Sequence, residues 1–355
     1  MAQNSSSLPL VWLLKSPHTG DHTQLVALAE NLGWPTAVKN LSYTKFQSLA
    51  RMTFGATLLG THPATLATLQ PPWPDLILGA GHPTEAAALW IKRHANPKVK
   101  LVFLGTPWAN LDKFDLVITT PQYRLPKRLN VLHNTLPMHK INSEKLISAT
   151  HQWQNKFKHL PKPWTGLLVG GASGPYTFDM AAGARLASAA NALGGSLLVT
   201  TSARTKPETA KALQAAITSP HHFHDWNHGS EENPFFGILA LADQFIVTAD
   251  SISMLAEACA TGRPVFMFDT EQAQFAMRDS GGPISWRGRN RSTTLFRLAM
   301  RFAPTRWSRD LRIIHRQLIA DGKANWLGTV TSRPSSQMPD DLARATSRVK
   351  SLFNL

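Results

Sequence analysis

Short apolar runs alternate with stretches of helical periodicity in the first half of the chain. The predicted strands are residues 10–14, 75–78, 100–104 and 115–118, and the helices include residues 22–32 and 86–91. Apolar strands separated by helices are typical of parallel βαβ units. The pattern therefore predicts an α/β domain of the Rossmann-like kind, built on a parallel sheet.

A second series of the same kind begins near residue 165. Its predicted strands are residues 165–169, 196–199 and 245–247, and its helices are residues 178–193, 207–217 and 234–242. We therefore predict an α/β fold of two tandem Rossmann-like domains facing a central cleft. The domains are residues 1–140 and 165–335, joined by a helical linker at 141–164 and followed by a C-terminal tail with a helix at 336–355.

A glycine-rich loop follows the first strand of the second series. It contains Gly170, Gly171, Ser173 and Gly174, and it leads into a predicted helix. Glycines let the backbone approach an anion closely, and a helix N-terminus attracts negative charge. The loop is thus a candidate for binding a diphosphate, although a tight turn requires the same glycines.

The next strand of that series also ends in a polar loop, which holds Ser202 and Arg204. Arg204 can neutralise a diphosphate, and Ser202 can hydrogen-bond to it. Neither loop has the dinucleotide pattern GxGxxG or the Walker pattern. This disfavours a nicotinamide oxidoreductase and a P-loop kinase.

The segment 248–269 combines a strand end, a helix and the next strand. Asp250 or Ser251 is expected to cap the helix. Ser253 and Glu257 are four residues apart, so they share one helix face. There the Glu257 carboxylate can accept hydrogen bonds from a ribose diol. The alternative is an ordinary amphipathic helix with a solvated glutamate.

The loop after the first strand of the chain carries His18 and Asp21. A general base that deprotonates a hydroxyl must be a histidine, a carboxylate or a similar group in the cleft. Both residues qualify by position, and Asp21 is equally suited to capping the following helix. No nucleophile-elbow motif or paired-carboxylate motif competes with them.

The composition narrows the class of protein further. A single cysteine, Cys259, excludes internal disulfides and a multi-cysteine metal site. The histidine-rich segment 221–228 lacks the partner carboxylates that would complete a zinc site, so no metal is expected. The chain offers no uninterrupted apolar run of about 18 residues for a membrane span. The N-terminus lacks a basic region, so the run at 8–14 is interpreted as a strand rather than a signal peptide.

The formal net charge is +15, and arginines are concentrated in the segment 278–316. This charge favours attraction to an anionic membrane surface or a phosphorylated partner, and a solvated basic face is the alternative. No recognition motif accompanies the charge, so specific nucleic-acid binding is not expected. The sequence makes no prediction of oligomeric state.

Several of these motifs together resemble known families. Two tandem Rossmann-like domains are similar to the GT-B fold of nucleotide-sugar glycosyltransferases. Glu257, followed five residues later by Gly262-x-Pro264, resembles the donor-site helix of the lipid-II-forming N-acetylglucosaminyltransferase family, and the segment 169–174 resembles its glycine loop.

Over residues 11–327 the chain is closer still to bacterial relatives of the plant "elongated mitochondria" fission protein. The clearest marks are at 170–174, 199–204, 232–234 and 247–264. In the first domain, the segments 16–24 and 104–110 depart from the family pattern.

The resemblance implies a GT-B-type glycosyltransferase that moves a sugar from a nucleotide-diphosphate donor to a cell-envelope or lipid-linked acceptor. The second domain would bind the donor and the first would hold the acceptor, with His18 or Asp21 as the base. The donor-site residues would be Gly170, Gly171, Ser173, Gly174, Ser202, Arg204, Asn233, Ser251, Ser253 and Glu257. Asn233 is also well placed to cap a helix.

No cofactor would be required, because positive side chains and helix dipoles can take the charge of the leaving diphosphate. The protein is expected in the cytoplasm, peripherally bound to the cytoplasmic face of the inner membrane. The alternative is a non-catalytic scaffold that recruits a partner at a membrane surface, because the eukaryotic relatives are regarded as recruiters of a fission GTPase.

Overall fold

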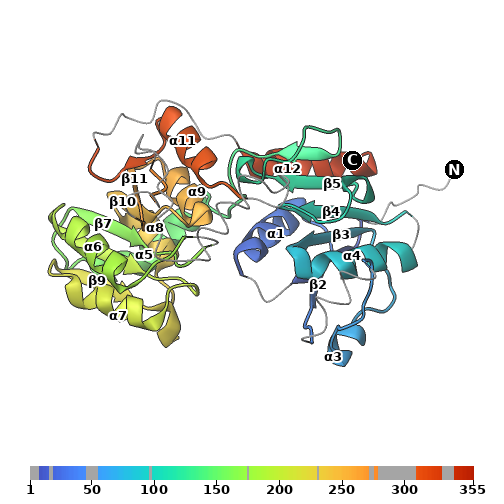
Figure 1. Cartoon of the computed structure of the whole chain (residues 1–355), viewed down its shortest axis with the longest axis horizontal. Coiled ribbons are helices and arrows are strands. Elements are labelled where there is room, and N and C mark those ends of the chain that lie inside the picture. The colour runs from blue at the N-terminus through green and yellow to red at the C-terminus, as the bar shows by residue number, and fades with distance from the viewer. Residues whose placement is uncertain are drawn as a thin grey trace, which may run out of the picture. The chain divides into compact units, whose positions relative to one another are not determined.

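The computed structural model describes residues 8–15, 19–44, 55–95, 98–173, 176–229, 232–271, 276–278, 309–329 and 340–355. The chain forms two compact units (Figure 1). Unit 1 consists of Met1–Lys140, Pro304–Arg309 and Pro339–Leu355, and unit 2 of Ile141–Ala303 and Asp310–Met338. Each unit contains its own six-stranded parallel sheet, which confirms the predicted α/β class with two tandem Rossmann-like domains.

Unit 1 is built on a sheet with the strand order β2-β1-β3-β4-β5-β6. Its strands are β1 (Val11–Lys15), β2 (Thr36–Asn40), β3 (Leu76–Ala80), β4 (Lys100–Leu104), β5 (Leu116–Thr119) and β6 (Val131–His133). Its helices are α1 (Thr19–Leu32), α3 (Pro63–Leu66), α4 (His82–His94) and α12 (Asp341–Lys350). Short 3-10 helices lie at Leu111–Lys113, Pro121–Tyr123 and Ser351–Phe353.

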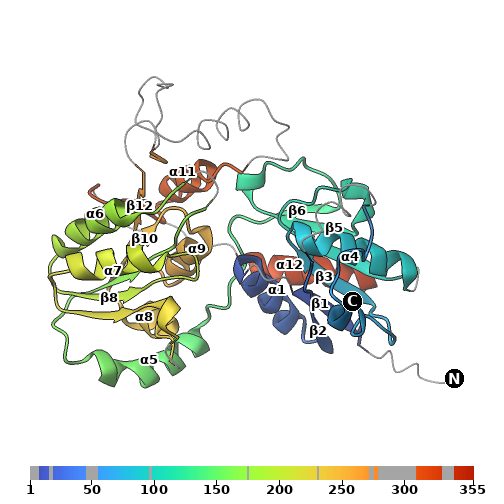
Figure 2. The same cartoon turned by 60° about the horizontal axis from the view of Figure 1, so that its bottom comes forward.

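Helices cover both faces of this sheet, which explains why its central strands are apolar throughout (Figure 2). Leu25 and Leu28 of α1 pack with Ala345 and Val349 of α12 on one face. On the other face, α4 packs through its buried alanines and Ile91. The last helix of the chain therefore completes the core of the first unit.

Unit 2 has the strand order β12-β11-β10-β7-β8-β9. Its strands are β7 (Trp164–Leu168), β8 (Ser196–Thr200), β9 (His221–His224), β10 (Gln244–Thr248), β11 (Val265–Phe268) and β12 (Asn325–Trp326). Its helices are α5 (Ser143–Phe157), α6 (Met180–Asn191), α7 (Pro207–Ala216), α8 (Phe235–Leu241), α9 (Ile252–Ala260) and α11 (Arg312–Ala320), with a 3-10 helix at Trp226–His228.

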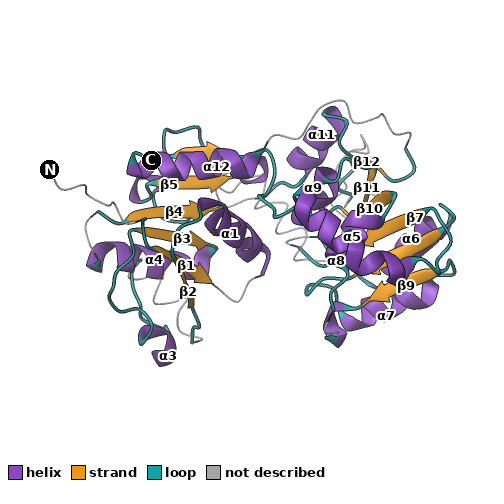
Figure 3. Ribbon diagram, turned by 180° about the vertical axis from the view of Figure 1, so that it is seen from behind, coloured by secondary structure: helices purple, strands orange, loops and turns teal. Residues whose placement is uncertain are grey.

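Here too the helices lie on both faces of the strands (Figure 3). α6 and α7 pack against each other over the core that contains Leu167, Val199 and Ile246. α5 and α8 pack together on the opposite side, where Gly237 lies against the Trp153 ring. A Cβ at residue 237 would come 2.3 Å from that ring, so glycine allows the two helices to approach closely.

The predicted strands and helices are confirmed to within a few residues, and residues 221–224 form an outer strand. The structure adds three strands that the hydrophobic pattern did not reveal: β2, β6 and β12. Residues 143–157 form the predicted helix, but that helix packs within unit 2 and is more than a connection. Among the residues that the structure describes, no helix has the length and apolar character needed to cross a membrane.

Candidate functional site

The sheet of unit 2 changes its direction of winding between β7 and β10. The chain passes from β7 through α6 to β8 on one side, and from β10 through α9 to β11 on the other. β7 and β10 are hydrogen-bonded neighbours, so the loops that follow them begin side by side. In open α/β sheets, ligands bind outside the carboxyl ends of the strands at such a switch point. The glycine loop and the start of α9 both lie there.

The glycine loop is fastened to the β10 loop by two hydrogen bonds across the switch point. The Gly170 N–H donates to Thr248 Oγ1 at 2.8 Å, and the Gly171 N–H donates to Asp250 Oδ2 at 3.1 Å. Both amides were predicted to face a diphosphate. In this structure they already have partners within unit 2.

Packing explains why these two positions are glycines. A Cβ at residue 170 would lie 2.6 Å from Asp250 Oδ2, and a Cβ at residue 171 would lie 2.1 Å from the Arg204 carbonyl oxygen. Both distances are much shorter than a van der Waals contact, so a side chain at either position would clash. Three loops, after β7, β8 and β10, can therefore meet only because the first has no side chains at these two points.

The exposed Arg204 and the buried Asp250 form an ion pair at this edge. The guanidinium Nη1 lies 3.0 Å from Asp250 Oδ2 and donates to the Ala172 carbonyl at 3.2 Å. Burial raises the pKa of Asp250, while Arg204, the Gly171 amide and Thr248 act in the opposite direction. Asp250 Oδ1 is buried and has no hydrogen-bond partner among the described residues. The pair thus leaves one acceptor atom unused at the switch point.

The turn after β8 is held together by Thr205, which the sequence analysis did not single out. Its Oγ1 accepts from the Ser202 N–H at 3.0 Å and donates to the Gly170 carbonyl. Ser202 Oγ accepts from the Arg204 N–H at 3.3 Å. Ser202 and Arg204 therefore lie next to the glycine loop, as the parallel topology predicts. Thr205 holds them there through its contact with the glycine loop.

Helix α9 begins at the same edge, and the predicted capping of this helix is wrong. Ser251 occupies the N-cap position without a side-chain hydrogen bond to the helix, and Asp250 is engaged by Gly171 and Arg204 instead. The helix ends as expected, with Gly262 at a φ of +72°.

Glu257 lies one turn beyond Ser253 on α9. Its exposed fraction is 9%, and among the described residues nothing hydrogen-bonds to its carboxyl or pairs with it. Burial alone raises the pKa of Glu257 to about 8. The carboxyl is therefore largely protonated at neutral pH in the free protein. A ligand that brought hydrogen-bond donors to it would favour the ionised form.

Helix α11 supports this edge from a distant part of the sequence. His315 is buried, and its Nε2 lies 2.7 Å from the carbonyl oxygen of Ala249, between β10 and α9. Burial lowers the pKa of His315 to about 4, so the ring is neutral and donates through Nε2. No local sequence pattern indicates this contact, because the two residues are 66 positions apart.

The structure describes only some of the remaining predicted site residues. Asn233 is exposed, and its Oδ1 accepts from the Phe235 N–H at 2.9 Å at the start of α8, although the N-cap position itself is taken by Pro234. His18 and Gly174 lie outside the described residues. Asp21 is in α1, and its side chain is outside the description.

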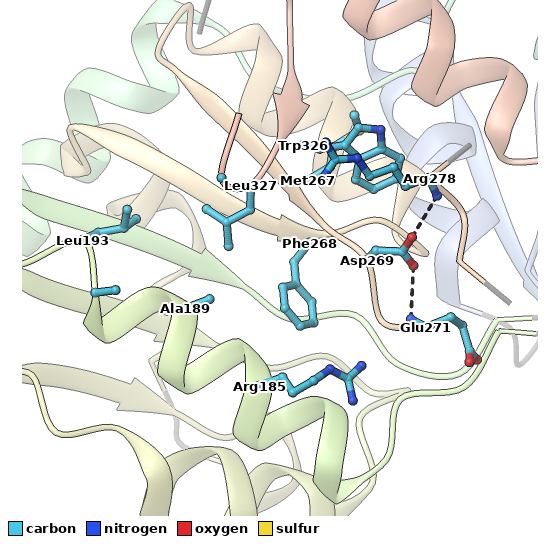
Figure 4. Close-up of a pocket in the computed structure, with 12 residues that line it drawn as sticks. Arg185, Ala189, Leu193, Met267, Phe268, Asp269, Glu271, Arg278, Trp326 and Leu327 are labelled. Carbon is cyan, nitrogen blue, oxygen red and sulfur yellow. Dashed lines mark hydrogen bonds between the residues drawn. The ribbon is translucent and has the colours of Figure 1, made fainter. Parts of the chain in front are cut away.

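A cavity of about 460 Å³ lies on the α6 side of β11 and β12 (Figure 4). Met267, Phe268 and Leu327 contribute apolar walls. At one end the Asp269 carboxylate accepts from the backbone N–H groups of Glu271 and Arg278. None of the residues predicted to bind the donor lines this cavity. Within the described ranges, no group of three or more histidine, cysteine or acidic side chains is arranged to hold a metal ion.

Comparison with known proteins supplies a family and a distant structural likeness. The family model described as "Mitochondrial fission ELM1" matches residues 19–294. The Mitochondrial fission protein ELM1 of Arabidopsis thaliana is 29% identical over 248 residues, which are 63% of this chain and 58% of that protein. The chain thus spans less than two thirds of that relative.

Two further proteins are more distant. The uncharacterized protein RP120 of Rickettsia prowazekii (strain Madrid E) is 23% identical over 306 residues, covering 73% of this chain and 82% of that protein. Among solved structures, a glycosyltransferase from Rickettsia africae ESF-5 has a TM-score of 0.49 at 9% identity, with 98% of this chain and 99% of that chain covered. We draw no functional argument from a likeness at that level.

Proposed function

Since the chain belongs to the Mitochondrial fission ELM1 family, we propose that it is a GT-B-type glycosyltransferase. Unit 2 would bind a nucleotide-diphosphate sugar at the carboxyl edge of its sheet. Unit 1 would hold a cell-envelope or lipid-linked acceptor, and His18 or Asp21 would accept the proton of its hydroxyl. The two tandem Rossmann-like units support the GT-B assignment, and the geometry of the unit 2 switch point supports the donor assignment.

The observation that carries this proposal is the carboxyl of Glu257, which has no partner among the residues that the structure describes. It lies in the helix that starts at the switch point, where a nucleotide is expected in a fold of this topology. A buried carboxyl without partners destabilises the free protein. The two hydroxyls of a ribose would satisfy it, because each can donate to one carboxylate oxygen.

The charge of a leaving diphosphate would be met by Arg204 and by the helix N-terminus that follows the glycine loop. The Gly170 and Gly171 amides have internal partners, so diphosphate contact through them would require the loop to rearrange. We propose that no metal cofactor takes part in the transfer.

A thermal-shift panel of UDP, GDP, ADP and their common sugar conjugates tests the donor site. Ligand at a hundred times Kd should stabilise the protein by about 2.7 kcal/mol. We expect one nucleotide to give this shift in the wild type and a much smaller one in Arg204→Met. Lys211→Met, which removes an exposed cation of α7, is the control. If no nucleotide stabilises the wild type, or if Arg204→Met is stabilised as much as the control, the assignment of the donor site is wrong.

A non-catalytic scaffold at a membrane surface is the second candidate. One observation favours it: the glycine-loop amides and Arg204 are already bound to Thr248 and Asp250, as in a site that has closed on itself. A measurement of catalytic turnover distinguishes the two candidate functions. Release of nucleoside diphosphate from a bound nucleotide sugar, on addition of membrane extract, requires an enzyme, whereas a scaffold leaves the donor intact.

We further propose that the protein binds peripherally to the cytoplasmic face of an anionic membrane through the arginines of the segment 278–316. Of these, Arg278, Arg309, Arg312 and Arg316 are described, and the others lie outside the described residues. Arg312 also pairs with Asp310 at 3.0 Å. Co-sedimentation with phosphatidylglycerol vesicles should be strong at low salt and weak at high salt, because salt screens the attraction. Sedimentation that is insensitive to salt would contradict the electrostatic attachment.

A further inference from the structure

We propose that unit 1 carries a second binding site, for a neutral hydroxyl-rich ring such as a sugar, formed by Trp108 and His82 and held in place by Glu85. The site depends only on unit 1, and its test is independent of the nucleotide site in unit 2. It lies at the carboxyl ends of β3 and β4, because α4 begins at His82 directly after β3 and Trp108 is in the loop after β4.

The position follows the same topological rule as the site in unit 2. In unit 1 the winding reverses between β1 and β3, because β1 leads through α1 to β2 on one side and β3 leads through α4 to β4 on the other. Ligands of such sheets bind at this point. His82 is the first residue of the helix that starts there.

Glu85 fixes the loop after β4 against the first turn of α4. Its carboxylate is buried and accepts from the Trp108 N–H at 2.8 Å and from the Ala109 N–H at 2.7 Å. Both oxygens are thereby occupied by backbone donors. A charge-assisted pair of this kind orders the loop and sets the direction of the Trp108 side chain.

The loop presents a large aromatic surface to solvent. The Trp108 side chain keeps an exposed fraction of 46%, and its ring lies 4.4 Å from the His82 ring at an interplanar angle of 42°. His82 Nδ1 is 3.9 Å from Glu85 Oε2 and has no hydrogen-bond partner among the described residues. An indole face and an unused ring nitrogen therefore lie next to each other.

Two buried polar side chains without partners lie at the same edge of the sheet, at the carboxyl end of the neighbouring strand β5. Thr119 at the end of β5 and Gln122 just beyond it are 2% and 3% exposed, and Thr119 Oγ1 and Gln122 Oε1 have no partner within the described part of the chain. Buried polar groups in native proteins are almost always satisfied, so such atoms indicate bound water or a ligand.

The chemistry of these groups selects the class of ligand. Gln122 Oε1 accepts hydrogen bonds, so a ligand that reaches it must supply donors. The Glu85 carboxylate disfavours an anion beside it. A sugar ring has hydroxyl donors at its edge and an apolar C–H face that fits the indole. A nucleobase offers a stacking face with few donors.

Saturation-transfer NMR on the full chain tests the site with glucose, mannose, galactose and N-acetylglucosamine, with uridine and inorganic phosphate as the competing classes. We expect at least one sugar to bind the wild type at millimolar concentration. The same sugar should bind Trp108→Ala about tenfold more weakly or not at all. Trp226→Ala is the control, because that tryptophan has a matching exposed fraction of 45% in unit 2.

A second pair of variants separates the imidazole from general effects on α4. His82→Asn should weaken binding of the same sugar, whereas His94→Asn should leave it unchanged. His94 is a suitable control because it also stacks on a tryptophan, Trp90, with ring centroids 4.0 Å apart. Circular dichroism of each variant establishes that it is folded. The proposal is overturned if no sugar of the panel binds, if uridine or phosphate binds in their place, or if the two control variants weaken the sugar as much as the test variants. A failure here leaves the thermal-shift result for unit 2 unaffected.

Discussion

Replacing Glu257 by glutamine is expected to stabilise the free protein at neutral and alkaline pH and to remove its response to nucleotide. Glutamine has the shape of a protonated glutamate and cannot ionise. The variant thus keeps the neutral form that the fold prefers and loses the anionic form that a ribose diol would prefer.

The sign and the size follow from the pKa of Glu257, which burial raises from 4.5 to about 8. Between these values the unfolded chain has released the proton and the folded chain retains it. The free energy of unfolding therefore falls as pH rises, by about 1.4 kcal/mol per pH unit. Below pH 4.5 both states are protonated and the effect vanishes.

A second buried group opposes this trend at lower pH. Burial lowers the pKa of His315 from 6.5 to about 4, so between those values stability increases with pH at a similar slope. Burial also lowers the pKa of His22, His139, His222 and His224, so the contribution of Glu257 is measured between pH 6.5 and 8 as the difference between the wild type and Glu257→Gln, which share these histidines. Over that interval the wild type should lose about 1.5 to 2 kcal/mol that the Glu257→Gln variant retains.

Urea unfolding at pH 6.5 and 8 measures this difference, with Glu208→Gln as the control at an exposed glutamate of α7. Comparing variants cancels the contribution of unit 1, which they share. The nucleotide identified by the thermal-shift panel is then added. The Glu257→Gln variant loses hydrogen bonds to a carboxylate, so its affinity for the nucleotide should be about ten- to a hundredfold lower than that of the wild type.

Calorimetric titration in two buffers gives an independent readout, because binding should release a proton from the wild type at pH 7 and none from the variant. Two results would refute the reasoning. Equal pH slopes for wild type and Glu257→Gln would mean that the carboxyl is not neutral in the free protein. Undiminished nucleotide binding by the variant would mean that Glu257 does not contact the ribose.

Two further predictions concern the support of the site. Gly171→Ala should destabilise unit 2 by about 3 kcal/mol or more in urea unfolding, because the new methyl would lie 2.1 Å from a backbone oxygen of Arg204. Gly183→Ala in α6, whose nearest contact is 3.4 Å, should instead stabilise by up to about 1 kcal/mol, and equal effects would contradict the packing argument. His315→Leu should cost about 1 to 3 kcal/mol, because it leaves the buried carbonyl after β10 without its donor. The stability of the wild type relative to that variant should also increase between pH 4 and 6.5, and a constant difference would exclude His315 as its source.

The hydrophobic pattern predicted those elements that bury a continuous apolar run. β7 and β10 are such strands, and the loops that follow them were correctly interpreted as the polar edge of the sheet. β2 was missed because its side chains alternate between exposed and half-buried, and β12 because it is only two residues long. The position of α12 in unit 1 depends on contacts with α1, which no local pattern records.

The site was predicted in part for the same reason. Residue type and spacing placed Arg204 in the loop after β8 and Glu257 in the helix after β10, and parallel topology brings these strand ends to the same edge of the sheet. The local capping rule failed at Asp250, because an arginine 46 positions earlier in the chain competes for the same carboxylate. Thr205 and His315 act through contacts between loops or from a distant helix. Their roles become visible only when the loops are placed in space.

The acidic side chains at the two sheet edges differ in whether the chain itself supplies their hydrogen-bond donors. Glu85 in unit 1 accepts two backbone amides, and Asp250 in unit 2 accepts an amide and pairs with Arg204. Each holds a loop in place and is compensated for its burial by donors from the chain itself. Glu257 has no such donor among the described residues, although it is buried to a similar degree and costs stability at neutral pH. The chain thus supplies donors to Glu85 and to one oxygen of Asp250, whereas we propose that a ligand supplies them to Glu257. Glu257 is for that reason the residue on which the nucleotide assignment depends, and Glu85 should affect sugar binding only through the positions of Trp108 and His82.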